Sequence, residues 1–119
     1  MPTLVDLLLD VKRIRDRILN NIDYYLSRIK DVVLRLDPPN AELMLIGSYV
    51  RGNFRPDSDV DVLIISDVYG DDPHKYVELV MSIIKEVGDD ALLVFEFHVI
   101  SRETYSEWYS KFIDIYRII

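Results

Sequence analysis

The chain has 119 residues, of which 50% are hydrophobic and 29% charged, and its 14 basic and 21 acidic side chains leave a net charge of −7. This composition excludes a disordered chain, and the acidic balance disfavours binding to duplex nucleic acid or anionic membranes, whose phosphates attract basic surfaces. The absence of cysteine excludes disulfides, cysteine-bound zinc and thiol nucleophiles. The length predicts a single domain over residues 1–119.

Apolar runs along the chain are too short to cross a membrane, which takes ~20 consecutive apolar residues. The leucines at positions 7–9 are flanked by Asp6 and Asp10 and follow no basic segment, so we expect no signal peptide there. These features predict a cytoplasmic protein without a membrane partner.

The first third of the chain has the pattern of an amphipathic helix. Thr3 and Asp6 match a capping box, in which a hydroxyl and a carboxylate satisfy the first free amides of a helix. Apolar residues then recur at steps of three or four, the spacing that keeps one helical stripe apolar. They are Leu4, Leu8, Val11, Ile14, Ile18, Ile22, Tyr25, Ile29, Val32 and Leu36. We predict a long N-terminal helical segment over residues 1–37, ended by the prolines at 38–39, as one helix or as two broken near residues 20–21.

Residues 41–100 carry the pattern of a small sheet. Three segments rich in apolar and β-branched residues are predicted strands: residues 42–46, 59–65 and 91–100. A helix is predicted between the last two strands, from the Asp-Asp-Pro sequence at 71–73 to Gly88. Ser101 or Thr104 is predicted to cap a C-terminal helix over residues 101–119. The order predicts an α+β fold with layers of the α/β type, in which helices cover a small sheet.

Two aspartates and a glycine-serine pair adjoin the predicted strands. Asp59 and Asp61 lie two apart in a strand, so their carboxylates are expected on the same face, where they repel each other unless a cation lies between them. Hard oxygen ligands of this kind suit Mg²⁺. Gly47 and Ser48 directly follow a strand, and glycine lets the backbone approach a phosphate while serine adds a hydroxyl donor. The segment predicts a site for a metal and a phosphate.

Two other phosphate or metal motifs do not match this segment. A P-loop would need lysine after Gly52, where Asn53 stands. An EF-hand beginning at Asp57 would need glycine and glutamate at the positions of Val62 and Val68. What remains is Gly-Ser, ten residues, and then Asp-x-Asp.

That pattern resembles the signature of the DNA polymerase β-type nucleotidyltransferase superfamily. The fuller string over residues 47–61, Gly-Ser-x-x-Arg-Gly followed by Pro-Asp-Ser-Asp-Val-Asp, looks like the minimal nucleotidyltransferase branch, whose small members are often paired with a helical toxin partner. The motif covers 15 residues, and the order of strands extends the resemblance over roughly residues 40–100. The resemblance implies a small mixed sheet covered by helices, behind a long N-terminal helix.

The superfamily also uses a third carboxylate on a neighbouring strand. By strand alternation, Glu96 and His98 share one face, and Glu96 is the one acid in an otherwise apolar strand. Glu96 is therefore the candidate third ligand, although the family more often has aspartate there; the alternative is a salt bridge to Arg51 or Arg55. A hydrogen-bonded core histidine describes His98 at least as well as an active-site role.

The resemblance implies a transferase that moves a nucleoside monophosphate, AMP from ATP in the first instance, onto a hydroxyl acceptor. Asp59 and Asp61 would hold two Mg²⁺ ions, one of them shared with Glu96. The residues that would contact the phosphates of ATP or another nucleoside triphosphate are Gly47, Ser48, Arg51 and Arg55. The acceptor and the base preference are not specified by the sequence.

The alternative is a non-catalytic, antitoxin-like module that neutralises a helical partner by contact alone, but three clustered carboxylates favour the enzyme. The resemblance also implies a protein partner, which is a small helical protein or a second copy, since we expect no acceptor-holding domain in a chain of this length. The long first helix could form that contact. An aromatic stripe near the C-terminus could as well, although such a stripe is more typical of a core than of a base-stacking surface. It consists of Tyr105, Trp108, Tyr109, Phe112 and Tyr116.

Overall fold

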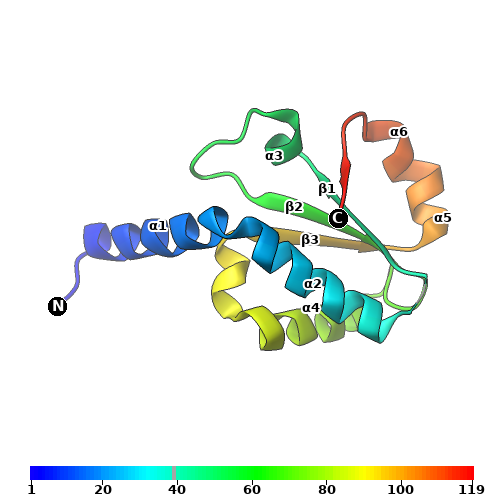
Figure 1. The fold of residues 1–119 in the computed structure, drawn as a ribbon, viewed down its shortest axis with the longest axis horizontal. Helices are drawn as coiled ribbons and strands as arrows, with labels where there is room; N and C mark the ends of the chain where they lie inside the picture. Colours follow the sequence, from blue (N-terminus) through cyan, green and yellow to red (C-terminus); the bar gives the residue numbers. More distant parts are fainter. Residues whose placement is uncertain (39) are drawn as a thin grey trace.

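The computed structural model describes residues 1–38 and 40–119, and its centre is a four-stranded mixed sheet (Figure 1). The strands lie in the order β3-β2-β1-β4. Their bounds are β1 Glu42–Ile46, β2 Val60–Ile65, β3 Phe95–Ile100 and β4 Arg117–Ile118. β2 and β3 run parallel, whereas β1 runs antiparallel to both β2 and β4. The predicted α+β fold, with helices over a small mixed sheet, is confirmed.

The N-terminal segment consists of two helices, α1 (Leu4–Asn20) and α2 (Ile22–Leu36). The capping box is present, because Thr3 Oγ1 accepts from the Asp6 amide at 3.1 Å and the Thr3 amide donates to Asp6 at 3.0 Å. The break lies at Asn21, whose side-chain amide donates to the Arg17 carbonyl at 2.8 Å. α2 ends before the two prolines, of which the one at position 39 lies outside the described residues.

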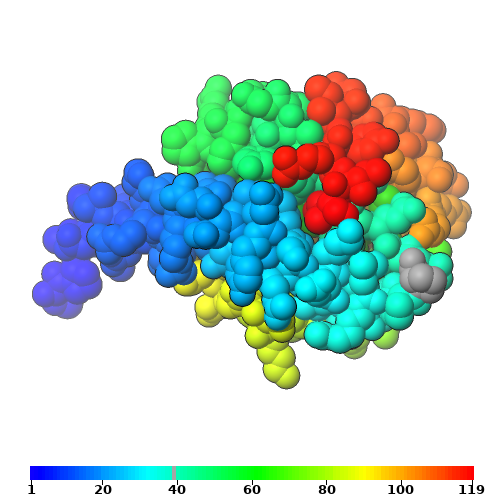
Figure 2. All heavy atoms as spheres, viewed as in Figure 1, coloured from blue at the N-terminus to red at the C-terminus, as the bar shows by residue number. Residues whose placement is uncertain are grey.

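The apolar stripe of α1 is buried at one end of the helix and exposed at the other. Ile18 is fully buried, but the first two turns project from the body of the molecule (Figures 1 and 2). The exposed apolar residues there are Leu4, Val5, Leu7, Leu8, Leu9 and Val11. None of the helices in the described part of the chain is long and apolar enough to cross a membrane.

α2 and α4 (Pro73–Val87) cover one face of the sheet. α4 starts as predicted, since the Asp72 side chain accepts from the His74 amide at 2.8 Å and Pro73 occupies the first turn, and it ends at Gly88. Alternate residues of each strand point into this core. They are Leu43 and Leu45 of β1, Val60, Val62 and Ile64 of β2, and Phe95, Phe97 and Val99 of β3.

The third strand is shorter than the prediction of residues 91–100. Asp89–Leu93 form a 3₁₀ helix, η1, and β3 begins at Phe95. The amides of Ala91 and Val94 donate to the carbonyls three residues earlier, and the Val94 carbonyl accepts from Val60 at 2.7 Å. A short apolar run fits a buried turn as well as a strand, so composition alone could not place this boundary.

The predicted C-terminal helix over residues 101–119 is also too long. Ser101 caps a helical stretch made of α5 (Arg102–Thr104), the π-helical turn η2 (Tyr105–Tyr109) and α6 (Ser110–Phe112). The chain then extends and forms β4, in which Ile118 pairs with Met44 of β1. The edge of β1 offers free backbone groups that a strand can satisfy, and β-branched isoleucines favour the extended conformation.

This C-terminal stretch covers part of the second face of the sheet. A smaller core there joins one or two residues of each longer strand to the helical stretch; its members are Met44, Leu63, Ile65 and Ile100, with Tyr105, Tyr109 and Ile113 packed against them. The aromatic stripe, which is more typical of a core, is therefore core only in part. Trp108 and Phe112 are exposed because the helical stretch turns only one side to the sheet, and Tyr116, in the extended segment before β4, is exposed as well.

Candidate active site

The uncovered part of the second face carries three polar side chains. Asp61 of β2 and Glu96 of β3 are direct partners in the parallel register, and His98 follows two residues after Glu96. One potential ligand atom from each of the three lies within 4.8 Å of the others. We call Asp61, Glu96 and His98 the acid–histidine cluster. The alternation of β3 already placed His98 beside Glu96, and this signal could have marked it as a site residue.

Asp61 is held between His98 and Gly47. His98 Nε2 and Asp61 Oδ1 are 3.1 Å apart, within hydrogen-bond distance. On the other side, Gly47 has a φ of +79°, and a Cβ built on it would overlap Asp61 Oδ2. This close approach follows from the pairing of β1 with β2, in which Ile46 lies opposite Asp61. Gly47 is therefore required both by its backbone conformation and by the carboxylate that it contacts.

Asp59 lies outside the cluster, and the predicted strand over residues 59–65 begins one residue too early. β2 starts at Val60, so the alternation that fixes Asp61 does not extend to Asp59. The Asp59 side chain is 49% exposed and its Oδ1 lies 3.7 Å from Nη1 of Arg15. The two aspartates therefore come from the same segment but face different partners.

Arg15 is a buried residue of this region that the sequence did not reveal. Its guanidinium group donates to the carbonyls of Leu93, Pro56 at 3.1 Å and Ser58 at 2.5 Å. These contacts tie α1 to η1 and to the loop that carries Asp59. A charged residue placed between Val11 and Ile18 on the apolar side of the helix was the available signal.

The remaining candidates lie around α3 (Ser48–Arg51), which follows Gly47. The Ser48 carbonyl accepts from the amides of Gly52 and Asn53. Arg51 Nη2 lies 3.6 Å from Asp114 Oδ1, and Arg55 is exposed in the loop, where its amide donates to Ser58 Oγ at 3.1 Å. Among the described residues, neither arginine forms the alternative salt bridge to Glu96.

The sequence matches the nucleotidyltransferase domain family over residues 26–118. The chain belongs to this family. The fold is also similar to the crystal structure of a candidate nucleotidyltransferase from Sulfolobus solfataricus, with a TM-score of 0.56 and 16% identity over 91% of this chain and 84% of that one. No curated protein matches the chain. The family match confirms the resemblance to the minimal nucleotidyltransferases and the enzyme class.

The acid–histidine cluster of this nucleotidyltransferase fits a divalent cation. Asp61 and Glu96 are paired on adjacent strands, so their carboxylates repel each other, and a cation bound between them would remove that repulsion. Their oxygens and the imidazole nitrogen are all common ligands of divalent metals.

Tyr76 of α4, a helix on the opposite face of the sheet, reaches the backbone of β3. Tyr76 donates from its hydroxyl to the Phe97 carbonyl at 3.1 Å. Burial raises the pKa of Tyr76, and the negative charge of Glu96 raises this pKa further. Tyr76 therefore stays a neutral hydrogen-bond donor beside β3 over the physiological range.

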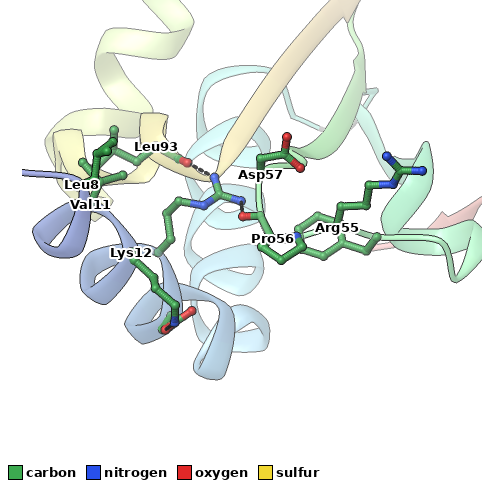
Figure 3. A pocket seen from close by; sticks show the side chains of 10 residues that line it. Leu8, Val11, Lys12, Arg55, Pro56, Asp57 and Leu93 are labelled. Atoms are coloured by element: carbon green, nitrogen blue, oxygen red, sulfur yellow. Dashed lines mark hydrogen bonds and ion pairs between the residues drawn. The ribbon is translucent and has the colours of Figure 1, made fainter. Parts of the chain in front are cut away.

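A groove of about 740 Å³ lies between α1 and the loop that contains Pro56 and Asp57 (Figure 3). Leu8 and Val11 form its helical side. The acid–histidine cluster does not line this groove. Arg15 lines the groove and lies 3.7 Å from Asp59, so the groove adjoins the loop that carries Asp59.

Proposed function

We propose that this nucleotidyltransferase transfers a nucleoside monophosphate, AMP from ATP in the first instance, to a hydroxyl acceptor with the help of divalent ions, Mg²⁺ being the expected one. The observation that carries this proposal is the register of β2 and β3, which places Asp61 and Glu96 side by side on the uncovered face. The family match supports a nucleoside triphosphate as the substrate.

Asp61 and Glu96, with Asp59 on the adjacent loop, would hold the metal ions. When bound, such ions offset the charge of a triphosphate and lower the pKa of an acceptor hydroxyl. In the transfer, the acceptor oxygen bonds to the α-phosphorus, the bond from that phosphorus to the oxygen bridging to the β-phosphate breaks, and pyrophosphate leaves. The proton of the hydroxyl passes to solvent or to a nearby carboxylate.

Gly47 and Ser48, next to Asp61, would contact the departing phosphates. Arg51 and Arg55 flank them in α3 and in the following loop. An arginine there would offset the negative charge that develops on the leaving pyrophosphate. Arg51 would first have to leave Asp114, a pair that is half exposed and therefore weak.

The acceptor would be carried by a partner polypeptide in a toxin–antitoxin-like pair in the cytoplasm. The first two turns of α1 support this proposal, because they present apolar side chains to solvent and no element within residues 1–38 and 40–119 covers them. A small helical protein or a second copy of the chain would fit such a surface, and a tyrosine hydroxyl is a suitable acceptor. The same surface favours the second candidate function, a non-catalytic module that neutralises its partner by contact.

The test is incubation of the protein with Mg²⁺ and ATP labelled at the α-phosphate, alone and with the protein product of the neighbouring gene. We expect label on the partner with the wild type and none with Asp61→Asn. A partner that binds wild type and Asp61→Asn equally, and is never labelled, would support the contact-only function instead.

A further inference from the structure

The proposed metal site contains a nitrogen donor as well as carboxylates. The side chains of His98 and Asp61 are 27% and 23% exposed, so both are accessible from the uncovered face while their backbones are fixed in the sheet. His98 is opposite Leu63 in the register, and the polar group that its ring contacts is Asp61. His98 is therefore partly exposed and paired with a carboxylate, which distinguishes it from a histidine enclosed in the core.

The distances within the acid–histidine cluster fit ligands of one ion. Two ligand atoms that each lie ~2.1 Å from a metal, at right angles to each other, are about 3 Å apart. Nε2 of His98 and Oδ1 of Asp61 are 3.1 Å apart. The Glu96 carboxylate supplies a third ligand atom within 4.8 Å of both. A single ion could therefore contact all three with small side-chain movements.

The Asp61 side chain is also held from behind, and the backbones of the other two ligands are fixed in the sheet. Gly47 packs against the second oxygen of Asp61, and parallel pairing fixes the spacing of Glu96 and His98 relative to β2. A site that is in place before the ion arrives favours the metal that matches its donor set.

We propose that His98 is a direct ligand of the ion that Asp61 and Glu96 hold, and that this ion site prefers Mn²⁺ to Mg²⁺. This inference rests on the proposed function. Mg²⁺ prefers oxygen ligands and retains its waters, whereas imidazole nitrogen suits transition metals, and Mn²⁺ accepts both nitrogen and carboxylate ligands. As a ligand, the ring carries its proton on Nδ1 and offers the Nε2 lone pair to the ion.

The first test is spectroscopic and uses the otherwise unaltered site. The chain has two histidines, so His74→Gln, on the exposed first turn of α4, leaves His98 as the one imidazole. Pulsed electron paramagnetic resonance of bound Mn²⁺ should show a directly bonded nitrogen, and the signal should change when the histidine is labelled with ¹⁵N. Mn²⁺ bound without such a nitrogen coupling would overturn the proposal.

The second test measures Mn²⁺ and Mg²⁺ affinities by titration for the wild type, His98→Gln and the control His74→Gln. We expect His98→Gln to lower the Mn²⁺ affinity by about tenfold or more, with a much smaller effect on Mg²⁺, and His74→Gln to change neither. An equal loss for both ions would mean that His98 only orients Asp61 through a hydrogen bond, and the proposal would be wrong.

The two proposals fail in different ways. If Mn²⁺ and Mg²⁺ bind at a site lost in Asp61→Asn, but without nitrogen ligation, the inference on His98 fails and the proposed function stands. If neither ion binds at a site that depends on Asp61, both are wrong.

Discussion

The two faces of the sheet are built from the same three strands but do different things. On the face under α2 and α4, Val60, Val62 and Ile64 of β2 are fully buried in an apolar core. On the opposite face, Asp61 lies in the acid–histidine cluster, while Leu63 and Ile65 pack beneath the C-terminal helical stretch. One residue of offset along a strand separates the core from the candidate site.

The buried face therefore determines the geometry of the open one. A shift of β2 by one residue would turn Val60 and Val62 to solvent and bury Asp61, so the hydrophobic core strongly disfavours it. The same register sets Asp61 opposite Glu96. Asp61 and Glu96 lie side by side because the residues that alternate with them along β2 and β3 are held in the core.

The largest contrast is expected between adjacent residues of β2. Asp61→Asn should reduce transfer by about a thousandfold or more, since it removes a metal ligand, while the free energy of unfolding changes by less than about 0.5 kcal/mol. Val62→Asp should prevent folding, because it buries a charge in the apolar core. Label transfer and circular dichroism would measure the two effects. An Asp61→Asn variant that keeps wild-type activity would contradict the assignment of the site.

Glu96→Gln separates the roles of the two carboxylates. We expect transfer to fall nearly as far as in Asp61→Asn, with much of the affinity for ATP retained, because the third carboxylate is proposed to serve the ion that activates the acceptor. Equilibrium binding of ATP and single-turnover transfer would be compared in the two variants. Transfer at the wild-type rate would make Glu96 a structural residue.

Gly47 and Gly52 are a matched pair for testing the contact with Asp61. Both have positive φ, of +79° and +85°, but an added Cβ meets Asp61 at Gly47 and nothing within 4 Å at Gly52. Gly52→Ala should lower the free energy of unfolding by about 1 kcal/mol from backbone strain alone. Gly47→Ala should lower it further and also weaken metal binding. Equal losses of stability and unchanged metal affinity would show that Asp61 moves aside freely.

Substitutions of Arg15 test whether its contacts from α1 support the loop that carries Asp59. Arg15→Ala should lower the free energy of unfolding by about 2 kcal/mol, because the carbonyls of Pro56, Ser58 and Leu93 lose a donor. The KM for ATP should rise as the Asp59 loop loses its support, and Arg15→Lys should restore part of it. Arg13→Ala, which removes an exposed pair with Asp10, is the control and should change little.

The sequence predicted the secondary structure correctly where hydrophobic periodicity and local motifs indicated the same element. The capping box at Thr3 and the start of α4 at Pro73 were predicted because each depends on local contacts. The strand over residues 42–46 was predicted from its short apolar run. The alternation of β3 also paired Glu96 with His98 correctly. Each of these features lies within a few consecutive residues.

The failures concern contacts between distant segments. β4 forms because β1, some seventy residues earlier, has a free edge with which it can pair. The sequence of residues 113–119 alone does not indicate that such an edge is available. Arg15 and Asp59 meet across 44 positions, which a helical stripe cannot show. The apolar turns at Leu4–Val11 have the same period as a buried helix, and their exposure depends on the absence of a neighbour in the described structure.

The smallest expected effect concerns Asp71, which forms hydrogen bonds to the start of the C-terminal helical stretch. Asp71 has a φ of +64°, and its carboxylate accepts from Ser101 Oγ at 2.5 Å, from the Ser101 amide at 3.2 Å and from Thr104 Oγ1 at 2.8 Å, at the start of the C-terminal helical stretch. The hydrogen bond from the Ser101 hydroxyl is the main reason why the pKa of Asp71 lies below its usual value of 3.8, and burial opposes it. The charged form is therefore favoured in the folded state, so its contribution is present above the unfolded pKa and lost as the pH falls through the folded pKa.

Asp71→Asn should accordingly reduce the free energy of unfolding at pH 7 by only about 0.5 kcal/mol, because the carboxylate is exposed and solvent screens it. Asparagine tolerates the positive φ, so the backbone is not strained. The difference between wild type and variant, measured by urea unfolding from pH 7 to pH 3, should shrink below about pH 4. In a Ser101→Ala background the difference should be smaller at every pH, since the main partner is gone. A difference that stays constant with pH would show that the pKa of Asp71 does not contribute to how the helical stretch is held on the open face.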